Sequence, residues 1–129
     1  MTMTIGEVAT HTGLTIDTLR LYEREGLLTA PVKRSHSGRR DYSEGDVAWL
    51  VTCRLFRASG MPLATIRRFA ELVREGEGNE GQRLALLRDH QRHIDEQRAA
   101  LDACHALISS KVEIYERAVA DGAAGGLWT

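Results

Sequence analysis

The sequence predicts a mainly α-helical chain in which a small domain precedes one long helix. Over residues 1–75, apolar side chains recur at the three- and four-residue spacing of short amphipathic helices, and glycine or proline separates the runs. Residues 80–120 lack proline and carry an apolar side chain at every seventh position. A polar, glycine-rich segment joins the two regions, and we expect residues 121–129 to form a flexible tail.

The overall charge does not indicate a nucleic-acid partner, but the distribution of charge along the chain does. The 129-residue chain has a formal net charge of −1. Residues 33–40, Lys-Arg-Ser-His-Ser-Gly-Arg-Arg, nevertheless hold four basic side chains and no acidic one, whereas residues 80–121 hold six basic and eight acidic ones. A basic segment beside a suitable helix is the local feature expected of a DNA-binding surface.

The first predicted helix covers residues 5–12. Thr4 and Glu7 have the spacing of a capping box, in which each side chain bonds the backbone N–H of the other residue. Gly13 then interrupts the helix. The side chains expected on its core face are Ile5, Val8 and Ala9.

A second short helix is predicted within residues 15–26, with Thr15 as its N-cap and Gly26 at its end. The side chains expected to pack on the core are Ile16, Leu19 and Tyr22. The side chains outside this stripe, available to solvent or a ligand, are Thr18, Arg20 and Arg24. Two short helices joined by a tight glycine turn, the second bearing arginine, form the pattern of a helix-turn-helix.

Residues 32–42 are expected to form a hairpin, or wing. Pro31 prevents a helix from continuing, and Gly38 can adopt the positive φ that the turn requires. A charged loop of this kind is often only a solvated surface. Its position directly after the helix pair favours contact with a DNA backbone instead.

Two further helices are predicted after the wing. Ser43 caps the third helix with Asp46 at the matching position, and Pro62 suits the first turn of the fourth. Apolar spacing gives the core stripe of the third helix as Val47, Leu50, Val51, Leu55 and Phe56. That of the fourth is Leu63, Ile66, Phe69, Ala70, Leu72 and Val73, and Trp49 is expected to cover the core edge.

The long helix, residues 80–120, would be roughly 60 Å in length at 1.5 Å per residue. One seam position is steadily apolar: Leu87, Ile94, Leu101, Ile108 and Tyr115. An isolated helix has no core in which to bury such a stripe, so a coiled coil with a second copy of the chain is the simplest arrangement. The alternative is a helix that folds back on its own domain.

These segments together resemble the MerR family of transcription regulators. The similarity covers TIGEVATHTGLTIDTLRLYEREGLL and PVKRSHSGRRDYSEGDV, and it extends without gaps from residue 4 to about residue 73. The resemblance implies a winged helix-turn-helix DNA-binding domain followed by a dimerisation helix. It further implies that this helix forms an antiparallel coiled coil within a two-fold homodimer.

Residue chemistry and the resemblance together give a set of candidate DNA-binding residues. Arg20 and Arg24 are the best candidates for base edges, and short hydroxyl side chains suit phosphate or a thymine methyl group. The family usually has a second tyrosine where this chain has Leu21, which removes one phosphate hydrogen bond. The full set is Thr15, Thr18, Arg20, Tyr22, Arg24, Lys33, Arg34, Arg39, Arg40 and Tyr42.

The resemblance implies a dimer that binds a near-palindromic promoter site and distorts the DNA so that RNA polymerase can use it. Activation and repression both remain open. A DNA-architectural protein of the excisionase type is the alternative, although the long helix argues against it. We do not expect an enzyme, because Cys104 and His105 point about 100° apart on a helix and the sequence contains no other catalytic pattern.

The resemblance also bears on the signal to which the protein responds. The residues SGRRDY and GMPL, with Lys111 and Tyr115, look most like small family members that respond to aldehydes or electrophiles, a stress response. Cys53 and Cys104 are therefore possible sensors, although each is equally a small buried or coil-packing residue. We predict no cofactor and no metal site, because His90 and His93 have no third ligand.

Neither a signal peptide nor an apolar run long enough to span a bilayer is evident in the sequence. We therefore expect a cytoplasmic protein with reduced thiols and no membrane partner.

Overall fold

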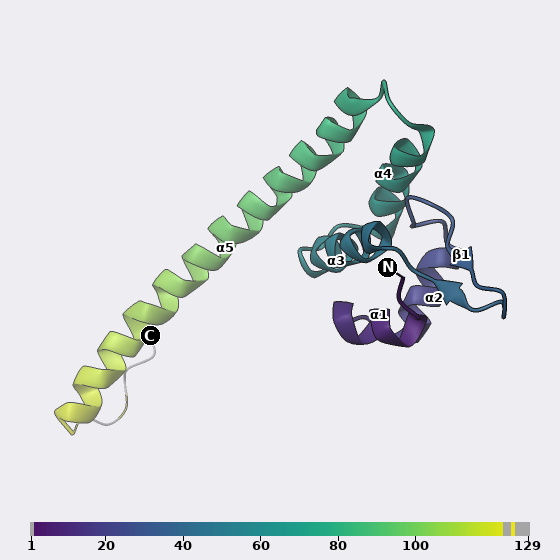
Figure 1. Ribbon diagram of the computed structural model, residues 1–129. Coiled ribbons are helices and arrows are strands. Elements are labelled where there is room, and N and C mark those ends of the chain that lie inside the picture. Colours follow the sequence, from purple (N-terminus) through teal and green to yellow (C-terminus); the bar gives the residue numbers. More distant parts are fainter. Residues whose placement is uncertain (1, 123–124, 126–129) are drawn as a thin grey trace. The chain divides into compact units, whose positions relative to one another are not determined.

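The computed structural model describes residues 2–122 and 125, which are mainly helical as predicted (Figure 1). Packing divides the chain into two compact units, one extending to His90 and the other beginning at Gln91. The predicted tail falls largely outside the described residues. The elements are α1 (Ile5–Thr12), α2 (Ile16–Arg24), β1 (Lys33–Arg34), β2 (Arg40–Asp41), α3 (Glu44–Ala58), α4 (Leu63–Glu75) and α5 (Glu80–Ala120).

Local capping interactions fix the starts of the first two helices, as the sequence predicts. The Thr4 backbone N–H donates to Glu7 Oε1 at 3.0 Å, and the Glu7 N–H donates to Thr4 Oγ1 at 3.2 Å. Thr15 caps α2, since its hydroxyl oxygen accepts the backbone N–H of Thr18 at 3.0 Å. These bonds satisfy amides that have no partner within the helix, so they set where α1 and α2 begin.

The wing is a two-stranded antiparallel hairpin, as predicted. Arg34 pairs with Arg40, and Gly38 in the turn has a φ of +82°. Beyond β2, Met3 and Tyr42 form an isolated bridge in which each backbone N–H donates to the other residue's carbonyl, at 2.8 and 2.9 Å. The wing is therefore attached to the segment that precedes α1.

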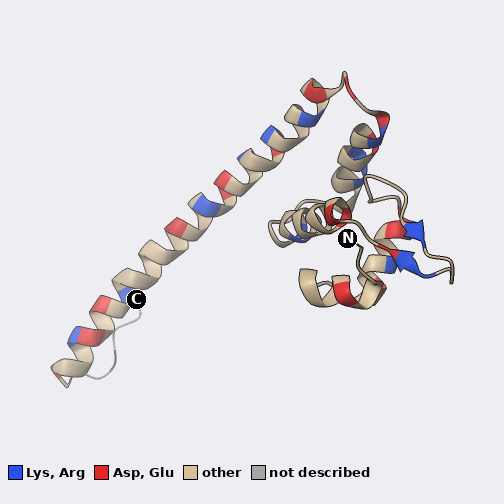
Figure 2. Ribbon diagram, in the orientation of Figure 1, with Lys and Arg blue, Asp and Glu red and all other residues tan. Residues whose placement is uncertain are grey.

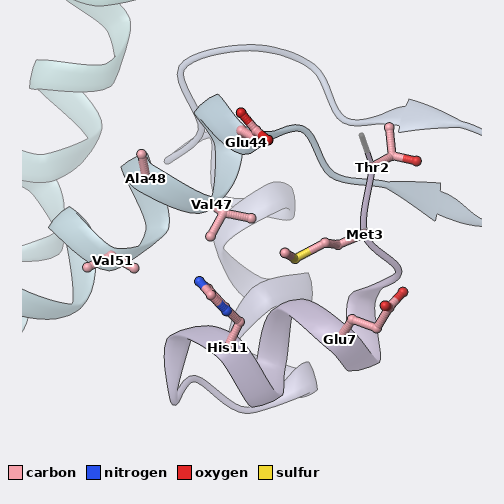
Figure 3. A pocket seen from close by; sticks show the side chains of 8 residues that line it. All are labelled: Thr2, Met3, Glu7, His11, Glu44, Val47, Ala48 and Val51. Carbon is pink, nitrogen blue, oxygen red and sulfur yellow. The ribbon is translucent and has the colours of Figure 1, made fainter.

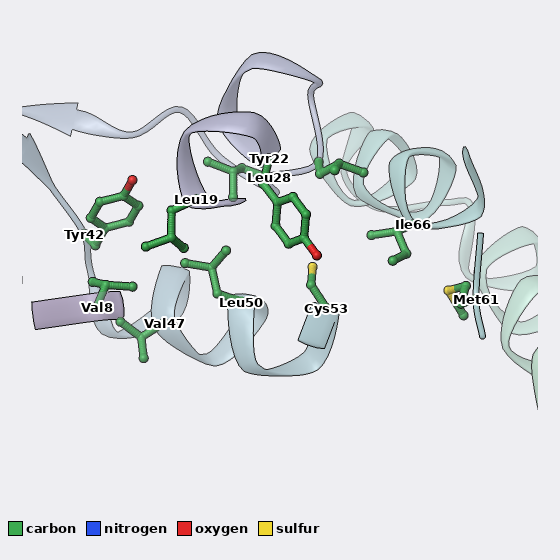
Figure 4. Packing of buried hydrophobic residues seen from close by; sticks show 11 residues of the cluster. Val8, Leu19, Tyr22, Leu28, Tyr42, Val47, Leu50, Cys53, Met61 and Ile66 are labelled. Carbon is green, nitrogen blue, oxygen red and sulfur yellow. The ribbon is translucent and has the colours of Figure 1, made fainter. Parts of the chain in front are cut away.

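Helices α1 and α2 pack on each other, and α1 and α4 both pack on α3 around one apolar core (Figure 4). Ser43 and Asp46 form the predicted capping box at the start of α3. Trp49 lies at the core edge as expected, where its indole N–H donates to the Leu27 carbonyl at 2.7 Å. The buried cluster consists of Val8, Leu19, Tyr22, Leu27, Leu28, Tyr42, Val47, Leu50, Cys53, Met61 and Ile66.

Two predicted core positions are wrong. Leu55 is 61% exposed and Ile16 is 37% exposed. On α3 the buried face runs through Val47, Leu50 and Cys53, at intervals of three. Side chains two positions apart on a helix point in directions roughly 200° apart, so Leu55 faces solvent when Cys53 is buried.

The first turns of α5 belong to the N-terminal unit. His90 is buried, its Nε2 lies 2.7 Å from the Ser59 hydroxyl, and its ring packs edge-on against Phe56 at 6.2 Å. Arg83 donates to the carbonyls of Leu72 and Gly76, at 3.2 and 2.7 Å. The start of α5 therefore contacts the chain's own α3 through His90.

Helix α5 contains 41 residues, in agreement with the predicted length. Most of the predicted seam is exposed on the chain: Leu87 by 38%, Leu101 by 68%, Ile108 by 58% and Tyr115 by 38%, with Ile94 partly buried. None of the described helices is both long and apolar enough to cross a membrane.

Candidate nucleic-acid interface

Helix α2 presents cationic side chains on the side opposite the core. Leu19 and Tyr22 are buried, and this orients the exposed Arg20 and Arg24, four residues apart, toward solvent. Figure 2 places further Lys and Arg residues on both strands of the wing. The N-terminal unit thus brings together the two cationic segments that the sequence singled out.

The hydroxyls of Thr15 and Thr18 take part in the capping of α2. Thr15 Oγ1 donates to Thr18 Oγ1 at 2.8 Å and accepts the backbone N–H of Thr18. Thr15 is exposed, whereas Thr18 is partly buried. These threonines set the start of the helix that carries Arg20, and their contact with DNA remains a prediction.

The wing arginines differ in how they are held. Arg40 Nε donates to Glu23 Oε1 at 2.5 Å, and Arg34 Nη2 donates to Glu23 Oε2 at 3.4 Å. The bond to Glu23 raises the pKa of Arg40 above its ordinary value. Lys33 and Arg39 are exposed. Glu23 therefore clamps the wing to α2 while Lys33 and Arg39 extend into solvent.

Sequence reasoning did not identify Glu23 as a functional residue. Glu23 and Arg40 are 17 positions apart, and the pairing depends on how the wing folds back on α2. Helical spacing within α2 gives no signal for this long-range contact.

The two candidate tyrosines lie in the core, as expected for Tyr22, whereas Tyr42 was expected on the surface of the wing. Tyr22 is 5% exposed and Tyr42 is 1% exposed, and burial raises the pKa of both hydroxyls. Figure 4 shows the Tyr22 hydroxyl directed at the sulfur of Cys53. The Tyr42 hydroxyl has no hydrogen-bond partner among the described residues. In this conformation neither hydroxyl is available to DNA.

The two cysteines have opposite environments. Cys53 is fully buried, and the burial raises the pKa of its thiol to about 12. A thiol with this pKa is protonated at neutral pH and is a poor nucleophile, which argues against Cys53 as a sensor. Cys104 is free and exposed on α5. Within residues 2–122 and 125, no three His, Cys, Asp or Glu side chains are grouped as a metal site requires.

Comparison with protein families gives two overlapping matches. Residues 3–72 match the family described as MerR HTH family regulatory protein, and residues 47–110 match the one described as MerR, DNA binding. The second match includes much of α5 as well as α3 and α4.

Individual proteins are similar over most of the chain. An uncharacterized HTH-type transcriptional regulator of Haemophilus influenzae is 34% identical over 95% of this chain and 90% of its own length. The regulator AdhR of Bacillus subtilis is 38% identical over 73% of this chain and 66% of its own length.

Solved structures agree with these relatives. HiNmlR, a MerR family regulator lacking the sensor domain and crystallised on promoter DNA, has a TM-score of 0.84 and 33% identity, covering 95% of this chain and 97% of HiNmlR. A MerR family regulator from Listeria monocytogenes has a TM-score of 0.87 and 26% identity, covering 93% and 90% of the two chains.

The helix pair, the wing and the exposed cations define a winged helix-turn-helix DNA-binding protein. The chain belongs to the MerR family, and it is a sequence-specific DNA-binding transcription regulator. These findings do not favour the architectural alternative. The family consists of transcription regulators rather than enzymes.

Proposed function

We propose that the protein acts as a homodimer on a two-fold symmetric promoter site, with α2 in the major groove and the wing on the backbone. The observation that carries the proposal is the exposure of Arg20 and Arg24 on a helix whose other side is locked in the core. The similarity to HiNmlR, which was crystallised on promoter DNA, supports this choice of ligand.

The side chains divide by the part of DNA that each one suits. Arg20 and Arg24 can offer two donors to a guanine edge, whereas Lys33 and Arg39 suit phosphates. Thr15 and Thr18 suit phosphate or a thymine methyl group. Glu23 binds both Arg34 and Arg40, so their first role is to position the wing. In this proposal they contact phosphate only at the edge of the wing.

The dimer forms, in this proposal, through an antiparallel coiled coil of α5. Four large seam side chains are 38% to 68% exposed on the single chain, and burying them against a second copy removes apolar surface from water. The charge of this region also suits dimerisation better than DNA binding, because residues 80–121 contain more acidic than basic side chains.

The bound dimer changes promoter activity by bending and untwisting the DNA between the elements that RNA polymerase recognises. Deformation of this kind costs energy that depends on sequence, so it contributes to site selection as well as to regulation. A small molecule or an electrophile is the proposed signal. Of the two thiols, Cys104 is the accessible candidate for an electrophile.

Selection of binding sites from random duplex DNA tests the proposal. The wild-type chain is expected to enrich two half-sites related by two-fold symmetry at one fixed spacing. The Arg20→Ala/Arg24→Ala variant is expected to enrich no common sequence. The Arg88→Ala/Arg98→Ala variant is the matched control, since it removes two exposed cations from α5. Enrichment of single, unpaired half-sites by the wild-type chain would contradict the dimer.

A further inference from the structure

The first turns of α5 are held against α3 and α4 at two points. Arg83 donates to the carbonyls of Leu72 and Gly76, at the end of α4, at 3.2 and 2.7 Å. Further along α5, His90 Nε2 lies 2.7 Å from the hydroxyl of Ser59, which directly follows α3. At 1.5 Å per residue, positions 83 and 90 are roughly 10 Å apart along the helix. Two such points fix a line, so together they orient the first turns of α5 on these two helices.

The Ser59 hydroxyl offers His90 a partner whose position is itself fixed. Its Oγ donates to the carbonyls of Leu55 and Phe56, both at 3.0 Å, in the last turn of α3. His90 is buried, and its ring packs edge-on against the Phe56 ring at 6.2 Å. His90 therefore meets a polar group and an aromatic ring that α3 holds in place, and the two contacts together determine how its side chain lies.

Aromatic side chains connect this contact to the segment that follows the recognition helix α2. Phe56 packs edge-on against Phe69 at 6.4 Å, and Phe69 is stacked on Trp49 at 5.8 Å. The indole N–H of Trp49 donates to the carbonyl of Leu27, which lies just beyond α2. Close-packed side chains transmit displacement rather than absorb it. A continuous series of contacts therefore leads from His90 of α5 to the end of α2.

The C-terminal end of α3 is where that helix meets α5. The groove of about 660 Å³ between α1 and α3 is lined on the α3 side by Val47, Ala48 and Val51, and its described lining contains no residue of α5 (Figure 3). Packing assigns the chain up to His90 to the N-terminal unit and the chain from Gln91 onward to the other. His90 is thus the last residue of α5 that belongs to the DNA-binding unit.

We propose that His90 is a positioning residue that sets the spacing of the two half-sites. This inference rests on the proposed homodimer, in which α5 joins each recognition helix to the second copy of the chain. The separation of the two recognition helices then depends on how each α5 is attached to its own N-terminal unit. Since half-site spacing follows from the geometry of the dimer, loss of the bond between His90 and Ser59 should allow several spacings where the wild type accepts one.

Substitutions at positions 90 and 59 separate the hydrogen bond from the packing. His90→Gln places an amide that can donate or accept where Nε2 lies, so it retains the bond to Ser59. His90→Leu retains a buried apolar side chain without the bond, and Ser59→Ala removes the other partner. His93→Leu is the matched control, because His93 is exposed on α5 and lies outside the N-terminal unit.

Fluorescence anisotropy tests the proposal on duplexes that carry a single selected half-site, a pair at the selected spacing, or a pair one base pair closer or further apart. The preference for the selected spacing should fall roughly fivefold in His90→Leu and in Ser59→Ala, the scale of one lost hydrogen bond. The double variant should lose no more than either single one, since both remove the same interaction. His90→Gln and His93→Leu should keep the wild-type preference. Every variant should bind the single half-site as the wild type does.

Three results would overturn the proposal. The first is a wild-type spacing preference in His90→Leu, and the second is a loss in His90→Gln as large as that in His90→Leu. The third is weakened binding of the single half-site by both His90→Leu and Ser59→Ala, which means that the contact only supports folding. A wild-type chain that prefers no spacing would contradict the homodimer as well as this inference. A wild-type preference that the variants share contradicts this inference alone, so the two failures are distinguishable.

Discussion

Arg20 carries the most specific claim at the scale of single residues. Its side chain is exposed on α2, and Leu19 beside it is fixed in the core, so Arg20 leaves the helix on the side away from the core. Arg20→Ala is expected to cost roughly 1–3 kcal/mol of binding to the cognate site and to relax preference at one base pair. Fluorescence anisotropy on the selected site and its single-base variants measures both effects.

Arg98→Ala on α5 is the control, because it removes the same charge far along the chain from α2. If Arg20→Ala weakens binding to all sequences alike, Arg20 touches only phosphate and the assignment to a base edge fails.

We expect Glu23 to lower the affinity for nonspecific DNA while it fixes the position of the wing. Glu23→Gln removes the charge that holds Arg40 and Arg34, so both arginines become available to phosphates. Affinity for nonspecific DNA should rise, with a salt dependence steeper by about 1 for each added phosphate contact. The preference for the cognate site should fall, because the wing is no longer fixed to α2. Binding measured over a range of salt concentrations reports both quantities.

Glu25→Gln is the matched comparison for this substitution. Glu25 directly follows α2 but pairs with Arg67 of α4, at 3.3 Å, and not with the wing. The clamp is disproved if both variants give the same salt dependence and the same specificity.

The buried thiol of Cys53 makes the stability of the folded protein depend on pH in the alkaline range. Burial raises the pKa of its thiol from 9.0 to about 12, so the folded protein holds this proton more tightly than the unfolded chain does. The contribution to stability is fully present below pH 9 and is lost as pH rises from 9 toward 12. Urea unfolding between pH 7 and 10.5 should therefore show stability that declines above pH 9.

Cys53→Ala should lower stability at every pH but make the alkaline decline shallower, because the titrating group is gone. Part of the decline should remain, since burial also raises the pKa of Tyr22 and Tyr42. Cys104→Ala should leave the profile unchanged. An unaltered slope in Cys53→Ala would contradict the raised pKa of the thiol.

At the scale of elements, the apolar seam of α5 is the exposed apolar surface that a partner helix would bury. Leu101 is 68% exposed near the middle of the seam. Leu101→Glu should dissociate the dimer by placing a charge in an apolar contact, whereas Ala106→Glu, on the opposite side of the helix, should not. Analytical ultracentrifugation measures both. The coiled coil would be refuted if Leu101→Glu remained dimeric at the same concentration as the wild type.

The elements themselves were largely predictable, because their ends depend on neighbours in the sequence. Capping boxes at Thr4 and Ser43 and the turn at Gly38 are local signals, and each lies where the sequence places it. The side of a helix that is buried depends on tertiary packing, which is why Leu55 was misplaced.

The candidate site likewise combines features that local sequence predicts with features that depend on tertiary packing. The exposed arginines of α2 followed from helical spacing, since Leu19 fixed the orientation of its neighbours. The clamp by Glu23 and the burial of Tyr42 arise from the wing folding against distant segments. No local pattern encodes such contacts, so only the structure could reveal them.

At the scale of the whole molecule, the chain combines cationic side chains on α2 and the wing with a long helix, α5, in which acidic side chains outnumber basic ones. A near-neutral total charge limits nonspecific attraction to DNA, while the local cations of α2 and the wing still attract phosphates. A dimer then reads two half-sites whose separation is set by the protein, and this geometry is the central claim of the proposed function.

Footprinting on the DNA upstream of the protein's own gene, with and without RNA polymerase, tests that claim most directly. The proposed function predicts protection of one two-fold symmetric site between the promoter elements, with hypersensitive cleavage near its centre where the DNA is bent. Leu101→Glu should lose this protection at the same protein concentration. Protection of a single asymmetric half-site by the wild-type dimer, or of a symmetric site with no distortion at its centre, would contradict it.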